Sequence, residues 1–204
     1  MIVVENKKTR GRPRAFERDV VLDRAMEIFW SAGYEAASVP MLTTAMGISA
    51  QSLYAAFGSK EALYREALER YRVTIGGFAA RALDEEADAL LAVERLLRDA
   101  ATTFARTVGT PGCMIATPST GATEAELTEL GRTLRAESVD RIAERLARGI
   151  AAGQIRSDTD CAAWSRYIGA VVQGMSIQAR DGASADALLA TAEVAVHSLK
   201  SLSV

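Results

Sequence analysis

The stretch SAQSLYAAF, residues 49–57, combines apolar anchors with a separate set of hydrogen-bonding side chains. Successive residues of an α-helix are about 100° apart, so Leu53, Ala56 and Phe57 fall on one side. The opposite side then carries polar or small residues: Gln51, Ser52, Tyr54 and Ala55. Glutamine can form two hydrogen bonds with an adenine edge, serine can bond to several bases, and an alanine methyl can contact thymine. This side therefore predicts base recognition in DNA.

Two consecutive helices are needed to position that surface. The sequence predicts helices over 38–46 and 49–57, joined by a turn that contains Gly47. This is the layout of a helix-turn-helix, in which the second helix enters the major groove. Thr43 and Thr44 on the first of the two helices are further candidates for base contacts.

Phosphate binding must come from elsewhere, because residues 46–55 hold no charged side chain. Exposed N–H groups and the positive end of the dipole let a helix N-terminus bind phosphate. Three helices are predicted to begin at capping serines: Ser38, Ser49 and Ser59. Lys60 adds a formal charge at the last of them. The remaining basic charge lies in an N-terminal arm, where phosphate or minor-groove contacts are expected from Arg10, Arg12 and Arg14.

The run VLDRAMEIFWSAGYEAASVPMLTTAMGISAQSLYAAFGSKEALY, residues 21–64, resembles the N-terminal domain of TetR/AcrR-family transcriptional regulators. Its matching elements include Gly33-Tyr34, Gly47-Ile48-Ser49, Leu53-Tyr54 and Phe57-Gly58-Ser59-Lys60-Glu61-Ala62-Leu63. The resemblance implies backbone contacts by Tyr54 and Lys60. It also implies a homodimer that binds a palindromic double-stranded DNA operator and is released by a small-molecule effector. The family commonly has larger residues where this chain has Ala55 and Ala56.

The rest of the chain also favours helices, so an all-α fold is predicted. Helices are expected at about 17–32, from Ser59 onward, and at 88–108, 123–152, 160–180 and 184–202, with an irregular stretch at 107–121. Gly76-Gly77 should end or bend the helix that starts near Ser59, and ligand binding is predicted to act through this bend. We expect three parts: a flexible basic arm at 1–16, the helix-turn-helix domain at 17–66, and a ligand-binding and dimerisation domain at 67–204.

Large apolar side chains in the second part are candidates for the wall of a ligand cavity, although each could be ordinary core. They are Phe78, Phe104, Met114, Ile115, Trp164, Tyr167 and Met175. As a set they favour an apolar or aromatic ligand, with the irregular stretch as its gate. Small and apolar residues on the last two helices are the predicted dimer interface: Gly169, Ala170, Val172, Gly174, Leu188, Ala192, Ala195 and Leu199.

Other classes of protein fit the sequence less well. The chain of 204 residues has one histidine, no phosphate-binding glycine loop and no recognisable catalytic constellation, so no enzyme, no cofactor and no metal site is predicted. A thiol switch at Cys113 is conceivable, but no basic neighbour is evident in the sequence. No signal peptide or membrane span is evident, and the cytoplasm is the expected location. Two alternatives stay open: a helical protein of the same fold that acts through a protein partner, and an activator instead of a repressor.

Overall fold

The computed structural model describes residues 15–105, 109–116 and 125–204, without the side chains of 15–17. This part of the chain is helical, and an isolated bridge between Ile155 and Ser203 is its only β-pairing. The all-α prediction is confirmed. The α-helices are α1 Ala15–Ala36, α2 Val39–Met46, α3 Ala50–Phe57, α4 Lys60–Val73, α5 Phe78–Glu85, α6 Ala89–Phe104, α7 Ala125–Ala151, α8 Cys161–Arg180 and α9 Ala185–Leu199, with short 3-10 turns η1 Ile75–Gly77 and η2 Lys200–Leu202.

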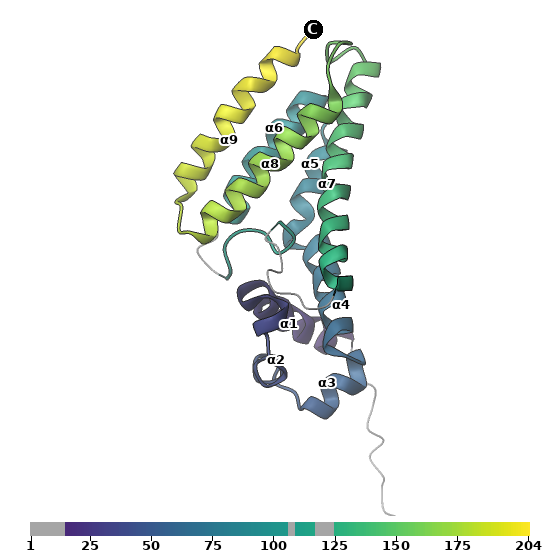
Figure 1. Cartoon of the computed structure of the whole chain (residues 1–204), viewed down its shortest axis with the longest axis vertical. Helices are drawn as coiled ribbons and strands as arrows, with labels where there is room; N and C mark the ends of the chain where they lie inside the picture. Colours follow the sequence, from purple (N-terminus) through teal and green to yellow (C-terminus); the bar gives the residue numbers. More distant parts are fainter. Residues whose placement is uncertain (1–14, 106–108, 117–124) are drawn as a thin grey trace, which may run out of the picture.

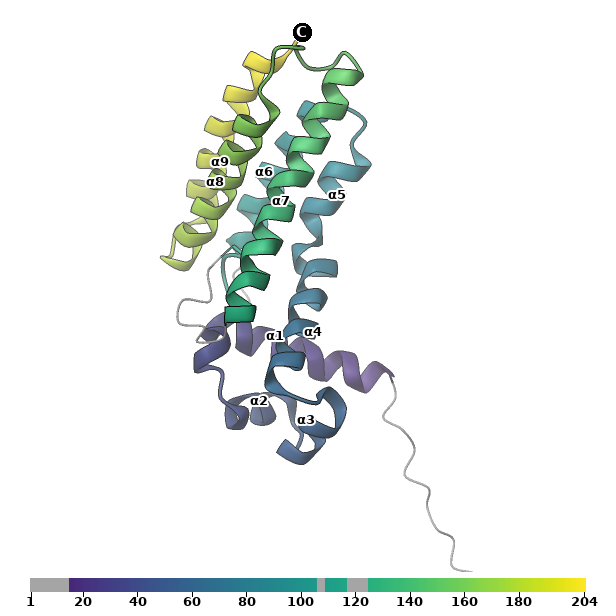
Figure 2. The ribbon, with the colours of Figure 1, turned by 45° about the vertical axis from the view of Figure 1, so that its right-hand side comes forward.

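The molecule is elongated, with α1–α3 at one end and the long helices above them (Figure 1). We call residues 15–73, which form α1–α4, the head, and residues 78–199, which form α5–α9, the bundle. Helix α4 extends from α3 toward the bundle. Helices α8 and α9 lie side by side at one edge of the bundle, away from α5 (Figure 2). No helix in the described part has the length and apolar character needed to cross a membrane.

Local capping explains where the short helices of the head begin. The hydroxyls of Ser38, Ser49 and Ser59 accept hydrogen bonds from the backbone N–H groups of Met41 at 3.3 Å, Ser52 at 3.1 Å and Ala62 at 3.0 Å. The three serine caps are therefore confirmed. Gly47 ends α2 with a φ of 70°, a left-handed conformation that favours glycine. Gly33 also has a positive φ, of 78°, and interrupts α1 where the sequence predicted its end.

Aromatic side chains fill the core of the head. The ring of Phe29 lies 5.1 Å from that of Tyr64, and Trp30 lies 5.0 Å from Tyr71, both at steep interplanar angles. Leu53 and Phe57 of α3 join this core, which fixes the orientation of the helix. The same apolar cluster takes in Met114 and two residues of α7, Leu127 and Leu134. Head and bundle therefore share buried surface, and the predicted boundary at residue 66 stays a prediction.

The bundle has its own core around α6, which packs against α5, α8 and α9. At its junction with the head, the chain passes from α4 through η1 into α5. The predicted break at Gly76-Gly77 is confirmed. A Cβ atom on Gly76 would lie 2.7 Å from the ring of Tyr71, so the close approach of that ring requires glycine here. Whether ligand binding acts through the bend stays a prediction.

Candidate nucleic-acid interface and ligand cavity

Helix α3 presents its polar side to solvent at the far end of the head. Leu53 and Phe57 are buried, whereas all four predicted base-reading residues are exposed: Gln51, Ser52, Tyr54 and Ala55. The hydroxyls of Ser49 and Ser52 lie 2.9 Å apart, so Ser52 is partly engaged in the cap of its own helix. Ala56, expected on the core side, is exposed, because α3 is eight residues long and only two of its side chains reach the core.

Helix α2 contributes less polar surface than the sequence suggested. Thr44 is exposed, but Thr43 is half-buried and its hydroxyl donates to the backbone carbonyls of Val39 at 2.9 Å and Pro40 at 3.1 Å. Met41, which the sequence did not single out, exposes 43% of its surface in the first turn of α2. Because a methionine in an amphipathic helix is usually core, only its orientation in the fold could identify it.

Basic side chains near α3 contact aromatic rings or a carboxylate of neighbouring residues. The ammonium of Lys60 lies 4.3 Å from the ring centre of Tyr34, a cation–π contact at the start of α4. Arg18 forms an ion pair of 2.8 Å with Glu66, and its guanidinium lies 4.7 Å from the ring centre of Phe57. The predicted arm residues lie outside the described part of the chain: Arg10, Arg12 and Arg14.

A cavity of about 320 Å³ lies where α4, η1, α5, α6, α7, α8 and residues 113–116 meet. Three of the predicted wall residues line it: Phe78, Phe104 and Ile115. The rings of Phe78 and Phe104 meet edge to face, with centres 5.8 Å apart. Its other apolar lining includes Leu83, Leu96, Val139, Ile142 and Val172. An apolar interior of this size is at the small end of ligand sites in proteins.

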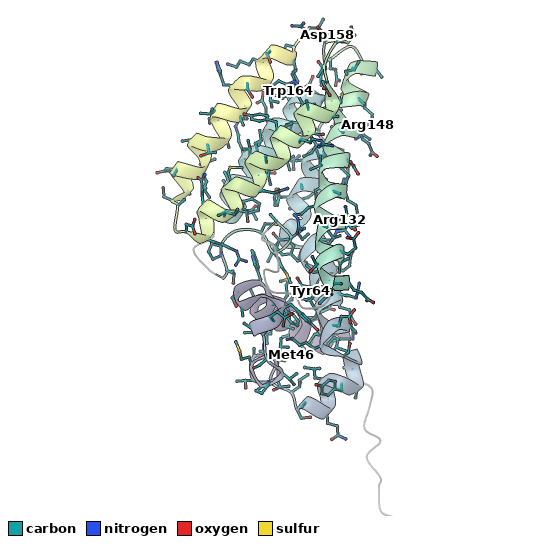
Figure 3. The ribbon with its side chains drawn as sticks, in the orientation of Figure 1. Met46, Tyr64, Arg132, Arg148, Asp158 and Trp164 are labelled. Carbon is teal, nitrogen blue, oxygen red and sulfur yellow. The ribbon has the colours of Figure 1, made fainter. Side chains whose placement is uncertain are left out.

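The other four predicted wall residues do not line the cavity. Met114 is buried in the core of the head, and Met175 in the core of the bundle. Trp164 and Tyr167 contact each other on α8, with ring centres 5.6 Å apart, and Tyr167 is exposed. Figure 3 shows Trp164 in the upper half of α8, far from Tyr64 in the head. Their size predicted burial, but only the packing of α8 decides which side of the helix meets the cavity.

Residues 21–67 match the sequence profile described as "Bacterial regulatory proteins, tetR family". Over 190 residues, 90% of this chain and 89% of the relative, the sequence is 35% identical to the HTH-type transcriptional repressor ComR of Escherichia coli K12. It is 27% identical over 202 residues, 99% of this chain and 98% of the relative, to the HTH-type transcriptional repressor BdcR of the same organism.

A solved structure gives the same result. A cysteine mutant of the TetR-family regulator CifR, in complex with 26-bp double-strand operator DNA, superimposes with a TM-score of 0.86. The two chains are 41% identical, and the match covers 92% of this chain and 98% of CifR. The chain belongs to the TetR family. It is a DNA-binding transcriptional regulator, not an enzyme, and its described residues hold no cluster of side chains suited to a metal ion.

In this TetR-family chain the head and bundle are also joined by a half-buried cation that the sequence gave no reason to select. Arg180, the last residue of α8, donates to the backbone carbonyl of Trp30 in α1 at 2.8 Å. Burial lowers the pKa of its guanidinium below the ordinary value, and the thiol of Cys113 lies within its electrostatic reach. Cys113 therefore does have a basic neighbour, contrary to the expectation, and its N–H donates to the hydroxyl of Ser176 at 2.8 Å.

The predicted dimer interface is corrected for α9. Four of its residues face the core of their own protomer and are at most 1% exposed: Leu188, Ala192, Ala195 and Leu199. Helix α9 packs that side against α6, so these residues cannot meet a partner. On α8, Gly169 is also buried, and a Cβ there would lie 2.8 Å from Val139 of α7. Ala170 is exposed, and Val172 and Gly174 are half-buried.

Exposed apolar side chains mark a different side of the same two helices. Tyr167 and Ile177 of α8 expose 39% and 49% of their surface, and Val194 of α9 exposes 72%. The hydroxyls of Tyr167 and Ser198, 3.5 Å apart, connect the two helices on this side. We call Tyr167, Ala170, Ile177 and Val194 the outer α8–α9 surface. That α8 and α9 form the dimer interface stays a prediction. The side chains now considered for it are those of the outer α8–α9 surface.

Proposed function

We propose that the chain is a repressor that binds a palindromic operator as a homodimer and is released when a small apolar or aromatic ligand enters the bundle. The observation that carries the proposal is the exposed polar side of α3, held in place by Leu53 and Phe57 beneath it. Relatives named as repressors and the operator complex of CifR support the same role. Direct base contacts are assigned to Gln51, Ser52 and Ala55, with Thr44 on α2.

Phosphate binding is assigned to the helix N-termini, to Tyr54 and to Lys60, with the basic arm as a further source of charge. Each capping serine satisfies one N–H group and leaves others in the first turn for an anion. The ammonium of Lys60 is held at the ring of Tyr34 with its charge uncompensated by a carboxylate among the described residues, so it can serve a phosphate.

The outer α8–α9 surface is the proposed interface between protomers. Isolated exposed apolar residues are common on monomers, but here aromatic and aliphatic side chains gather on two adjacent helices. A two-fold dimer repeats the same surface on both subunits and presents two α3 helices to the half-sites of a palindrome.

The proposed response to ligand rests on residues that touch both the cavity and the head. Cys113 lines the cavity and contacts the cores of both head and bundle, and the next residue, Met114, is buried in the head. Arg180 holds the end of α8 to Trp30 nearby. A ligand that moves residues 113–116 or α8 therefore acts on α1, and through it on the spacing of the two α3 helices.

The experiment is to recover the bound sequence by selecting from fragments of the native genome, then to measure affinity as a function of salt. We expect a palindrome, bound by one or more dimers, with a steep decrease of affinity with salt. Deletion of residues 1–14 should weaken binding and flatten that dependence. Failure to enrich any sequence would contradict the proposal and favour a protein partner, and reporter transcription that rises on binding would indicate an activator.

A further inference from the structure

Charged side chains line the cavity together with the apolar ones. Five of the lining residues are charged: Glu69, Arg72, Arg135, Glu137 and Arg141. The lining has three arginines and two glutamates, and Asp84, outside the lining, pairs with Arg141, so the formal charges around the cavity sum to zero. What a ligand would meet is therefore decided by how each arginine is paired and not by the net charge.

The arginines differ in how they are compensated. Arg72 lies 3.4 Å from Glu69 and 3.5 Å from Glu137, and Arg141 forms an ion pair of 2.8 Å with Asp84. Arg135 has no carboxylate within ion-pair distance among the residues that the structure describes. Its guanidinium instead donates to the backbone carbonyl of Ile115 at 3.2 Å. The charge of Arg135 is thus available to a ligand, whereas the other two are already neutralised.

The apolar side of the cavity determines which apolar group the ligand can carry. Phe78 and Phe104 meet edge to face, which suits an aromatic ring as a further partner. The volume of about 320 Å³ accommodates a small molecule with one ring and a short chain. Resting on the proposed ligand response, we propose that the effector is a small amphipathic anion whose carboxylate, or a similar acid group, is bound by Arg135.

Binding at Arg135 also has a consequence for the head. The acid group competes with the Ile115 carbonyl for the guanidinium, and a charged acceptor makes the stronger hydrogen bond. Residues 113–116 would then lose their bond to α7, and Met114 of this segment is buried in the core of the head. Arg135 would therefore both bind the acid group of the ligand and transmit its binding to the head.

The test uses three probes with the same apolar body: phenylbutyrate, phenylbutanol and phenylbutylamine. Calorimetric titration of the full-length, DNA-free protein should give phenylbutyrate an affinity at least about tenfold higher than the alcohol, with the amine weakest. Arg135→Gln should reduce the ratio of acid to alcohol affinity to near one, and Arg135→Lys should retain most of it. Arg132→Gln is the matched control, because Arg132 lies one turn earlier on α7 (Figure 3). It is outside the cavity lining and pairs with Glu129.

Three results would overturn the proposal: equal affinities of the wild-type protein for acid and alcohol, binding of none of the probes, or an unchanged ratio in Arg135→Gln. Operator binding is measured on the same preparations, and thermal unfolding shows that each variant is folded. Loss of acid selectivity with operator binding intact would reject the ligand class alone. Absence of operator binding in the wild-type protein would reject the proposed function instead.

Discussion

The head and the bundle are both helical, but their interiors differ. The head closes its core with aromatic rings in direct contact, such as Phe29 and Tyr64, and its short helices start at hydrogen-bonded serine caps. The bundle instead borders a cavity of about 320 Å³ beside Phe78 and Phe104, and α4 of the head contributes to its wall. A filled core resists deformation, whereas a cavity can accept a ligand. The DNA-reading end is therefore expected to stay rigid, and the bundle is expected to respond to a ligand.

The largest effect should come from opening the filled core. Phe29→Ala is expected to reduce the free energy of unfolding by about 3–5 kcal/mol, because a fully packed ring leaves a cavity behind. Phe78→Ala should cost less, since part of its ring already borders empty space and loses fewer contacts. Urea unfolding followed by circular dichroism gives both values, and the fluorescence of Trp30 in the head and Trp164 in the bundle locates each loss. Equal losses would contradict the difference in packing.

The next effect concerns the outer surface of the bundle. Val194→Asp should raise the dimer dissociation constant by at least about tenfold, because the symmetric interface would bury the new charge twice. Leu91→Asp on α6 is the matched control, since Leu91 is an exposed leucine outside the outer α8–α9 surface. Sedimentation equilibrium measures both constants. If Val194→Asp dimerises like the wild-type protein, the assignment of this surface is rejected.

The difference between head and bundle also explains what the sequence could predict. Helix starts in the head depend on neighbouring residues, so Ser38, Ser49 and Ser59 could be identified as caps from sequence alone. The buried side of α3 followed from the spacing of Leu53 and Phe57. Ala56 was predicted to be buried and is exposed. Helical periodicity gives the direction of a side chain but does not show whether a neighbouring helix covers it.

In the bundle, the helix bounds were predicted well and the packing sides were not. Leu188 and Leu199 have the spacing of an apolar face, and such a face serves an internal core or a partner equally well. Only the position of α6 shows that they are core. Arg180 could not be found at all, because its partner is the backbone of Trp30, 150 residues earlier in the chain. Contacts of this kind have no local sequence pattern.

A moderate effect is expected where the head reads bases. Gln51→Ala should reduce discrimination at one or two base pairs by about 1–3 kcal/mol while leaving non-specific binding unchanged. Gln178→Ala, at an exposed glutamine of α8 in the bundle, should leave the selected sequence unaltered. Selection from a randomised operator library, followed by competition binding, measures the effect. An identical motif for wild type and Gln51→Ala would remove Gln51 from the base-reading set.

The smallest effect is expected from removing a serine cap, in the head or in the bundle. Ser49 and Ser184 each cap a helix through one backbone N–H group, that of Ser52 at 3.1 Å and that of Ala187 at 3.2 Å. Replacing either serine by alanine should cost about 1 kcal/mol of stability. Only Ser49→Ala should also weaken operator binding, because it disturbs the first turn of α3, where Ser52 lies beside the Ser49 hydroxyl. Thermal unfolding and fluorescence anisotropy with operator DNA separate the two effects. Equal losses of operator affinity in both variants would mean that general stability, not the geometry of α3, controls binding.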